Sequence, residues 1–153
     1  MLIKKAEAND FDIVKNITAE TIRTIYPRYY PCGAVDFFLN HHNDENIMHD
    51  IKSGLVYLLE ENKSAVGTVT LRKNEICRLF VLPQYQKMGY GRTLLDFAED
   101  KILKNHNEIL IDASLPAKKI YLKRGYIETN YNTIITENGD FLCYDEMKKI
   151  LKR

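Results

Sequence analysis

Three β-prone segments follow one another in the middle of the chain, and the turns between them restrict how they can pair. They cover residues 55–60, 65–71 and 75–82, and short polar stretches at 61–63 and 72–74 separate them. A turn of this length joins antiparallel neighbours, whereas parallel neighbours need a crossover of about a dozen residues or more. The sequence therefore predicts an antiparallel three-stranded meander.

The segments on either side extend this meander into one mixed sheet with flanking helices. Further strands are expected over residues 2–7, 108–113, 126–136 and 141–145, about seven strands in all. Helices are expected after a cap at Asn9 or Asp10, after Asp44, after Gly89 and over residues 116–123. The helix after Gly89 predicts a strand–helix–strand crossover. The interpretation is a mixed α/β fold with a mostly antiparallel sheet, in a single domain of residues 1–153.

The composition excludes several classes of protein. The 153 residues include 22 Lys and Arg against 21 Asp and Glu, a net charge of +1, which argues against non-specific binding of nucleic acid. No run approaches the roughly 20 apolar residues that cross a bilayer, and the first residues lack the order of a signal peptide. Cys32, Cys77 and Cys143 are too scattered for a disulfide framework or a Cys-x-x-Cys metal site. We therefore expect a cytoplasmic protein without a membrane partner.

The stretch from Val81 to Arg92 holds a strand end, a short loop and two glycines that open an amphipathic helix. Glycines let the backbone approach a ligand closely, and the free N–H groups of a first helical turn favour a phosphate or pyrophosphate. Lys87 and Arg92 add positive charge. The pattern is neither a Walker loop nor the dinucleotide fingerprint, because Leu94 takes the place of a third glycine. On the glycines alone, a tight turn without a ligand is the alternative.

Two motifs resemble those of the GNAT superfamily of acyl-CoA-dependent N-acetyltransferases. Gln86-Lys87-Met88-Gly89-Tyr90-Gly91 is similar to the acyl-CoA-binding signature Gln/Arg-x-x-Gly-x-Gly/Ala. Residues 117–126 resemble the downstream segment Ala-x-x-x-Tyr-x-x-x-Gly-Phe/Tyr. The order of the predicted elements agrees over nearly the whole chain. The resemblance implies splayed central strands and acetyl-CoA as the co-substrate.

The resemblance also assigns residues to the co-substrate. The splayed strand would bind the pantetheine arm through Leu79, Phe80 and Val81. The loop and helix start would surround the pyrophosphate with Gln86, Lys87, Met88, Gly89, Tyr90, Gly91 and Arg92. Tyr121 stands where the family often keeps a tyrosine that protonates the departing thiolate. Ser114 replaces an asparagine of many members, so its contact with the pantetheine arm would pass through water or be absent.

Acetyl transfer to an amine needs a neutral amine, a stabilised carbonyl oxygen and a protonated leaving thiolate. Glu75 is the candidate base, because its spacing from Gln86 matches that of the glutamate in histone-acetylating members. The alternatives are an ordered water as base, or a solvated glutamate beside Lys73. Tyr121 is the candidate acid, with a core tyrosine as the alternative. By resemblance, the N–H of Leu79 would stabilise the oxyanion.

The connection after the first helix is aromatic and is the predicted wall of the acceptor site. In the resembling family, the first two helices, their connection and the last hairpin line the acceptor cleft. Tyr26, Tyr29 and Tyr30 lie in that connection, and their hydroxyls could orient a polar amine. The alternative is the packing of a loop framed by prolines. Arg28 among them would favour an acceptor with a carboxylate.

The remaining histidines and cysteines receive no catalytic role. Three histidines crowd residues 41–49, but adjacent helical side chains point about 100° apart, so no metal site is predicted. Cys77 is expected to share one face of its strand with Glu75 and Leu79, because alternate side chains point the same way.

The sequence therefore predicts an N-acetyltransferase that moves the acetyl group of acetyl-CoA to a primary amine. The amine belongs to a small molecule or a peptide and attacks directly within a ternary complex. The competing hypothesis is a CoA-binding sensor without turnover, although a sensor needs neither Glu75 nor Tyr121. Acetylation of charged transfer RNA is a third hypothesis, which the balanced charge disfavours. The acceptor, the acyl-chain preference and a homodimer, common in the family, are left open.

Overall fold

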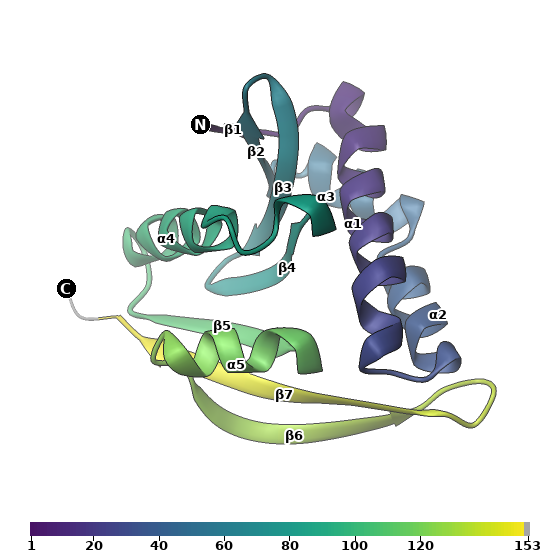
Figure 1. Ribbon diagram of the computed structural model, residues 1–153. Coiled ribbons are helices and arrows are strands. Elements are labelled where there is room, and N and C mark those ends of the chain that lie inside the picture. Colours follow the sequence, from purple (N-terminus) through teal and green to yellow (C-terminus); the bar gives the residue numbers. More distant parts are fainter. Residues whose placement is uncertain (152–153) are drawn as a thin grey trace.

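One mixed sheet of seven strands organises the computed structural model, which describes residues 1–151, in the order β1-β2-β3-β4-β5-β7-β6 (Figure 1). The strands are β1 (Leu2–Lys5), β2 (Val56–Glu61), β3 (Ser64–Arg72), β4 (Glu75–Val81), β5 (Glu108–Ala113), β6 (Ile127–Ile135) and β7 (Phe141–Ile150). The helices are α1 (Phe11–Ile25), α2 (Cys32–His41), α3 (Asp44–Lys52), α4 (Tyr90–Leu103) and α5 (Leu115–Lys123). The predicted mixed fold with a mostly antiparallel sheet is confirmed.

Strand pairing changes direction once, at the centre of the sheet. Strands β1 to β4 form the predicted antiparallel meander, and β5, β7 and β6 form a second antiparallel unit. Strands β4 and β5 are parallel, because helix α4 carries the chain across from one to the other. They pair only at Glu75 with Leu110 and at Ile76 with Ile111. Beyond these positions the two strands diverge, which confirms the splay that the family resemblance implied.

Two apolar cores lie on opposite faces of the sheet. Helices α4 and α5 cover one face, where Leu94, Ala98 and Tyr121 are buried. Helices α1, α2 and α3 cover the other (Figure 1), where Ile17 and Ile47 are buried. In α1, the buried Val14, Ile17, Thr18, Thr21 and Ile22 recur at helical spacing, which is why this segment packs as an amphipathic helix.

Helix α2 is the element that the sequence prediction missed. Its residues include Gly33, Val35 and two adjacent phenylalanines, which favour helix only weakly. Tertiary contacts stabilise it instead: Gly33, Ala34 and Val35 are buried, and the Gly33 N–H donates to Asp140 Oδ2 in the β6–β7 turn at 2.9 Å.

Two further boundaries differ from the prediction. Asn43, not Asp44, caps α3, because the Asn43 Oδ1 accepts a hydrogen bond from the Asn46 N–H at 2.9 Å. Strand β7 continues to Ile150 instead of ending at Asp145. Its charged second half is held by pairing along the whole of β5.

Candidate active site

The gap between the splayed strands exposes the backbone of β4. Leu82 N–H donates to Val66 O at 2.9 Å, and the register pairs Phe80 with Thr68. Because backbone groups alternate in direction along an antiparallel strand, those of Leu79 and Val81 point away from β3 into the gap. A side-chain contact supports this direction, because Val81 O accepts a hydrogen bond at 3.3 Å from Thr21 Oγ1, which lies on α1 and not on β3. The backbone groups of Leu79 and Val81 therefore face the gap, and their binding of the pantetheine arm stays a prediction.

Phe80, the third residue predicted on this strand, lies differently. Phe80 lies between Leu79 and Val81 on the strand, so its backbone N–H and C=O point towards β3 instead of into the gap. Its ring is buried on the opposite face, with its centroid 6.4 Å from that of Tyr26 and 5.7 Å from that of His42. Phe80 therefore packs the layer between β4 and the first helices.

The start of helix α4 has the geometry of an anion cradle. Gly89 has a φ of +94°, which L side chains rarely adopt, and a Cβ there would meet nothing within 4 Å. No side chain caps the helix, and its first turn holds no acidic residue. Its first N–H groups and its dipole are thus free for a phosphate, and Lys87 and Arg92 are exposed beside them. The residues present fit a pyrophosphate.

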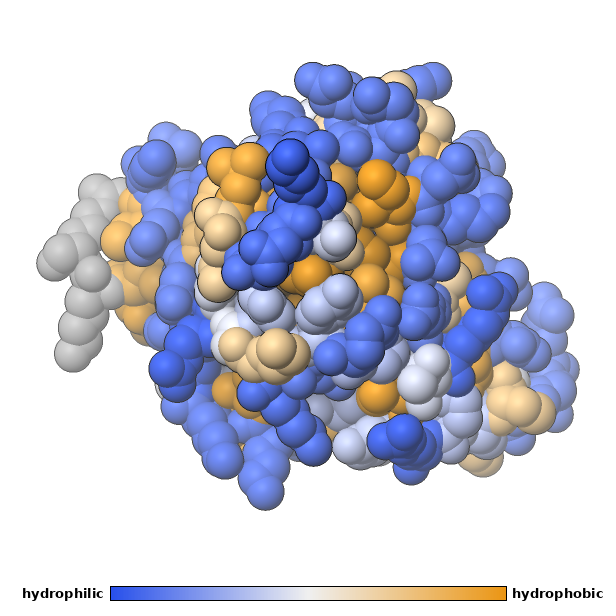
Figure 2. Space-filling view, turned by 45° about the horizontal axis from the view of Figure 1, so that its top comes forward, coloured by the Kyte–Doolittle hydropathy of each residue, from blue (hydrophilic) through white to orange (hydrophobic). Residues whose placement is uncertain are grey.

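Gln86 and Met88 contribute to this cradle in different ways. The Gln86 side-chain Nε2 donates to Val81 O at 3.0 Å, so it fastens the loop to β4. Met88 is 62% exposed and has room to contact a ligand. Figure 2 shows apolar side chains in the hollowed middle of one face of the molecule, with polar side chains around them.

Tyr121 projects from α5 into the core beside the gap. It is 6% exposed, and its ring centroid lies 5.5 Å from that of Tyr126. Burial, followed by the nearby Tyr26, raises the pKa of Tyr121 above its ordinary value. The phenol therefore keeps its proton at neutral pH, as an acid that protonates a thiolate must.

The predicted tyrosines of the first connection separate into three environments. Tyr26 is buried, and burial raises its pKa to about 12, against the effect of a hydrogen bond with Ser114. Tyr30 is buried too, and its hydroxyl accepts from the Leu115 N–H at 2.7 Å and donates to Cys143 O at 3.1 Å. Tyr29 is 51% exposed. Tyr30 thus joins α5 to β7.

Glu75 lies where β4 and β5 are still paired, half-buried. Burial, followed by the charge of Asp112, raises the pKa of Glu75, and Arg72 opposes the rise. A raised pKa makes this carboxylate a better proton acceptor than an ordinary glutamate.

A bulge in β4 corrects the predicted face of Cys77. Leu71 pairs with Ile76 and Thr70 with Arg78, so Cys77 is an extra residue. The alternation is reset there, and Leu79 packs with Ile76 in the core under α4, while Phe80 packs under α1. Leu79 and Cys77 therefore do not share a face as predicted. Burial raises the Cys77 pKa to about 11, so its thiol is a poor nucleophile.

A cavity of about 490 Å³ lies between α2 and the β6–β7 turn. It is lined by Gly33, Asp36, Phe37, Asn40, His41, Asn46, Thr136, Glu137 and Asn138. None of the three predicted tyrosines is among these residues. The sequence reasoning missed the cavity because it missed α2, although Asp36 and Asn40 are four residues apart and share one side of that helix.

Residues 1–151 hold neither a cluster of metal ligands nor a membrane-spanning helix. No group of three or more His, Cys, Asp or Glu side chains gathers there as metal ligands would. None of the helices in that range has both the length and the apolar composition to cross a membrane.

The chain is similar to acetyltransferases in sequence and in structure. Residues 18–151 match the family model of the acetyltransferase (GNAT) domain. The histone acetyltransferase ESA1 of Eremothecium gossypii is 30% identical over 94 residues, which cover 61% of this chain but only 20% of that relative. The chain thus spans about a fifth of its length.

Solved structures share the fold at low identity. The GCN5-related N-acetyltransferase of Rhodopseudomonas palustris superposes with a TM-score of 0.88 at 22% identity, covering 98% of this chain and 95% of its own. YncA of Salmonella typhimurium, solved with acetyl-CoA, has a TM-score of 0.74 at 17% identity, covering 100% and 95%. The chain belongs to the GNAT family of acetyltransferases, whose acetyl donor is acetyl-CoA.

Proposed function

We propose that this chain transfers the acetyl group of acetyl-CoA to a primary amine by direct attack within a ternary complex. The observation that carries the proposal is the splay of β4 from β5. It directs the backbone of Leu79 and Val81 into one gap, with the α4 anion cradle at its end and Tyr121 beside it. Donor binding and acid catalysis thus share one place.

Acetyl-CoA supplies a thioester whose carbonyl carbon the amine nitrogen attacks. The C–N bond forms, the C–S bond breaks, and the electron pair leaves with the sulfur. The Leu79 N–H, which points into the gap, stabilises the negative charge on the carbonyl oxygen. After attack the nitrogen carries an extra proton, which it releases to solvent. Tyr121 gives its own proton to the thiolate and regains one from solvent.

The proton of the amine goes to Glu75, directly or through a water molecule. An aliphatic ammonium has a pKa near 10.4, so a nearby acceptor must take its proton before attack. The raised pKa of Glu75 supports this role. An ordered water as the sole base is the alternative, and the pH profile of a Glu75 variant decides between them.

The acceptor enters through the cavity between α2 and the β6–β7 turn. The cavity is open to solvent on one side of the sheet and contains Asp36, Glu137 and His41 but no Lys or Arg. A cationic amine of a small molecule or a peptide suits such a lining. The match to a histone acetyltransferase supports a protein amine, whereas nothing in the charge of the chain favours a nucleic acid.

The competing hypothesis of a non-catalytic acyl-CoA sensor is disfavoured. The family model is that of acetyltransferases. A sensor would need the cradle at α4 but not a phenol beside the gap.

Three further parts of the proposal rest on single features. We place the protein in the cytoplasm because Cys32, Cys77 and Cys143 are free thiols. We treat residues 1–153 as one domain because the strands of residues 1–151 form one sheet. A homodimer could form through β6, an exposed edge strand.

Thermal unfolding with and without excess acetyl-CoA tests donor binding. At 100-fold over the dissociation constant, linkage gives about 2.7 kcal/mol of stabilisation, which raises Tm by roughly 5 to 11 °C for a domain of this size. Release of CoA is then measured with amino acids, aliphatic amines and peptides with free N-termini or lysines. No shift at millimolar acetyl-CoA contradicts donor binding. A shift without CoA release from any amine contradicts the proposed transfer.

A further inference from the structure

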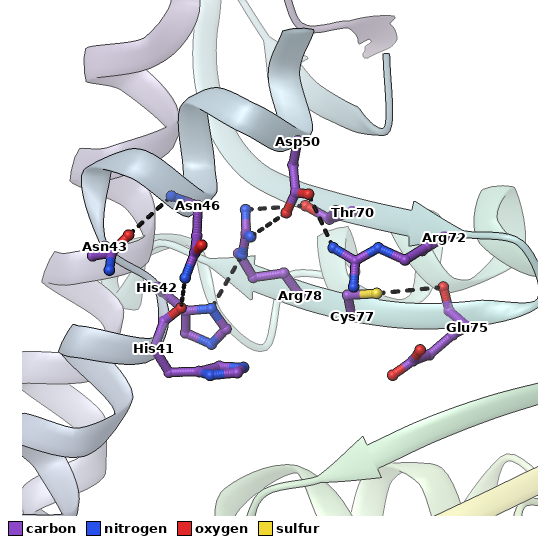
Figure 3. A network of polar contacts seen from close by, with 10 residues as sticks. All are labelled: His41, His42, Asn43, Asn46, Asp50, Thr70, Arg72, Glu75, Cys77 and Arg78. Carbon is purple, nitrogen blue, oxygen red and sulfur yellow. Dashed lines mark hydrogen bonds and ion pairs between the residues drawn. The ribbon is translucent and has the colours of Figure 1, made fainter. Parts of the chain in front are cut away.

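Hydrogen bonds hold the turn between α2 and α3 (Figure 3), next to the cavity that His41 and Asn46 line. Asn46 donates two hydrogen bonds to this turn, from its side-chain Nδ2 to His41 O at 2.9 Å and from its backbone N–H to Asn43 Oδ1. The His41 ring lies parallel to that of Phe37, with centroids 6.2 Å apart and an interplanar angle of 8°. Both His41 and Phe37 line the cavity.

A buried polar chain supports the same turn from the sheet. Arg78 on β4 is ion-paired with Asp50 on α3 at 2.5 Å, and both side chains are less than 5% exposed. The Arg78 Nε–H donates to His42 Nδ1 at 3.2 Å. The edge of the His42 ring meets His41, with centroids 4.9 Å apart, and Phe80, at 5.7 Å. Figure 3 shows this series of side-chain contacts, which runs from Asp50 through Arg78 and His42 to His41.

Burial and the contact with Arg78 together determine the protonation state of His42. Burial, followed by the charge of Arg78, lowers the pKa of His42 to about 3, so the ring is neutral at any working pH. Because Nδ1 accepts a hydrogen bond, the proton lies on Nε2. One tautomer and one ring orientation are thereby selected.

Stability alone gives no reason for this arrangement. Two buried ions lose their hydration, and apolar residues of the same volume are often as stabilising as a buried ion pair. Such a pair is, however, directional: it fixes the distance between α3 and β4 and the direction of the Arg78 Nε–H. The arrangement therefore specifies geometry at the turn that carries His41.

We propose that Asp50, Arg78 and His42 are positioning residues that hold the His41 ring in place as a contact for the acceptor amine. This inference rests on the proposed function of the cavity as the acceptor site. His41 lines that cavity and lies close enough to Asp112 to oppose the rise of the Asp112 pKa. Asp112 in turn neighbours Glu75, the candidate base. A displaced His41 would weaken binding of the acceptor and leave donor binding intact.

The test measures kcat and KM for both substrates in His42→Phe, His41→Ala and the double variant. The probe is the amine with the highest kcat/KM in the panel above. His42→Phe keeps a ring against Phe80 but leaves the Arg78 Nε–H without its acceptor, so we expect the KM of the amine to rise about tenfold, or 1.4 kcal/mol. The KM of acetyl-CoA and kcat should stay within about twofold. His49→Ala, at an exposed histidine of α3, is the matched control and should change neither KM.

The double variant separates positioning from general damage. If His42 acts through His41, the amine KM of the double variant equals that of His41→Ala, because nothing is left to position. Additive losses, or an equal rise in the acetyl-CoA KM, overturn the inference. If His42→Phe does not fold, His42→Gln replaces it: its side-chain oxygen can still accept from Arg78, but it lacks the ring that contacts His41, so the amine KM should rise as well, and an unchanged amine KM overturns the inference.

A second measurement needs no acceptor and separates this inference from the proposed function. Correlation of imidazole ¹⁵N and ¹H signals at about pH 5, below the ordinary histidine pKa, should show His42 neutral with its proton on Nε2. A protonated His42 at that pH overturns the network even if acetylation is found. If the spectrum is as expected but no amine is acetylated, the hydrogen-bond network is supported and the proposed function is rejected instead.

Discussion

Replacing Tyr121 by phenylalanine removes one oxygen atom and tests the proposed acid. The ring remains, with its contact to Tyr126 at 5.5 Å between centroids, so the core under α5 should keep its packing. Acid catalysis contributes about 10²–10⁴ in rate. We therefore expect kcat to fall at least about 100-fold, or about 2.7 kcal/mol of lost transition-state stabilisation, with the KM of acetyl-CoA nearly unchanged.

The assay is steady-state release of CoA from acetyl-CoA and the best amine of the panel, together with the acetyl-CoA-dependent shift in Tm. Tyr126→Phe is the matched control, because it too removes a buried phenol oxygen, one that donates to Glu99 Oε1 at 3.2 Å, in the same aromatic pair. It should lower Tm and leave kcat within about twofold. A kcat of Tyr121→Phe close to the wild-type value, or an equal loss in both variants, would refute an acid role for Tyr121.

Three further substitutions test other parts of the site. Glu75→Gln should remove the acidic limb from the pH profile of kcat/KM. Because folding raises the pKa of Glu75, its ionised carboxylate destabilises the folded state above that pKa. The variant should therefore have a higher Tm than the wild type at pH 7 and lose this advantage in acid, which thermal scans at the two pH values measure. Gly89→Ala should cost about 1–2 kcal/mol in unfolding by denaturant, because its φ of +94° disfavours any L side chain, and should raise the Kd of acetyl-CoA measured by calorimetry. Tyr30→Phe should cost about 1–3 kcal/mol, because the Leu115 N–H and Cys143 C=O lose their partner; an unchanged Tm would show that water replaces the hydroxyl.

The conformation of the segment proposed to bind the donor could be predicted from the sequence because it is local. The strand, loop, glycines and helix that form it lie between Leu79 and Arg92, and their conformations follow from turn and capping preferences. The positive φ of Gly89 and the uncapped start of α4 match what those residues predict. The bulge at Cys77 could not be predicted, because it depends on the register between β3 and β4.

The cavity proposed to bind the acceptor could not be predicted in the same way, because it joins parts of the chain that are far apart. Its cavity lies between α2 and the turn at Thr136 to Asn138, about a hundred positions later, and the Gly33 N–H binds Asp140 across it. That contact and the burial of Gly33, Ala34 and Val35 stabilise helix α2, whose intrinsic helix propensity is weak. Substitutions along α2 and the turn are therefore expected to change acceptor preference and local stability together. The α4 cradle shares no residue with the lining of the cavity, so its affinity for acetyl-CoA should stay the same. Measuring Tm and both KM values for Asp140→Asn would test this, since that change weakens the Gly33 contact and leaves the donor cradle untouched.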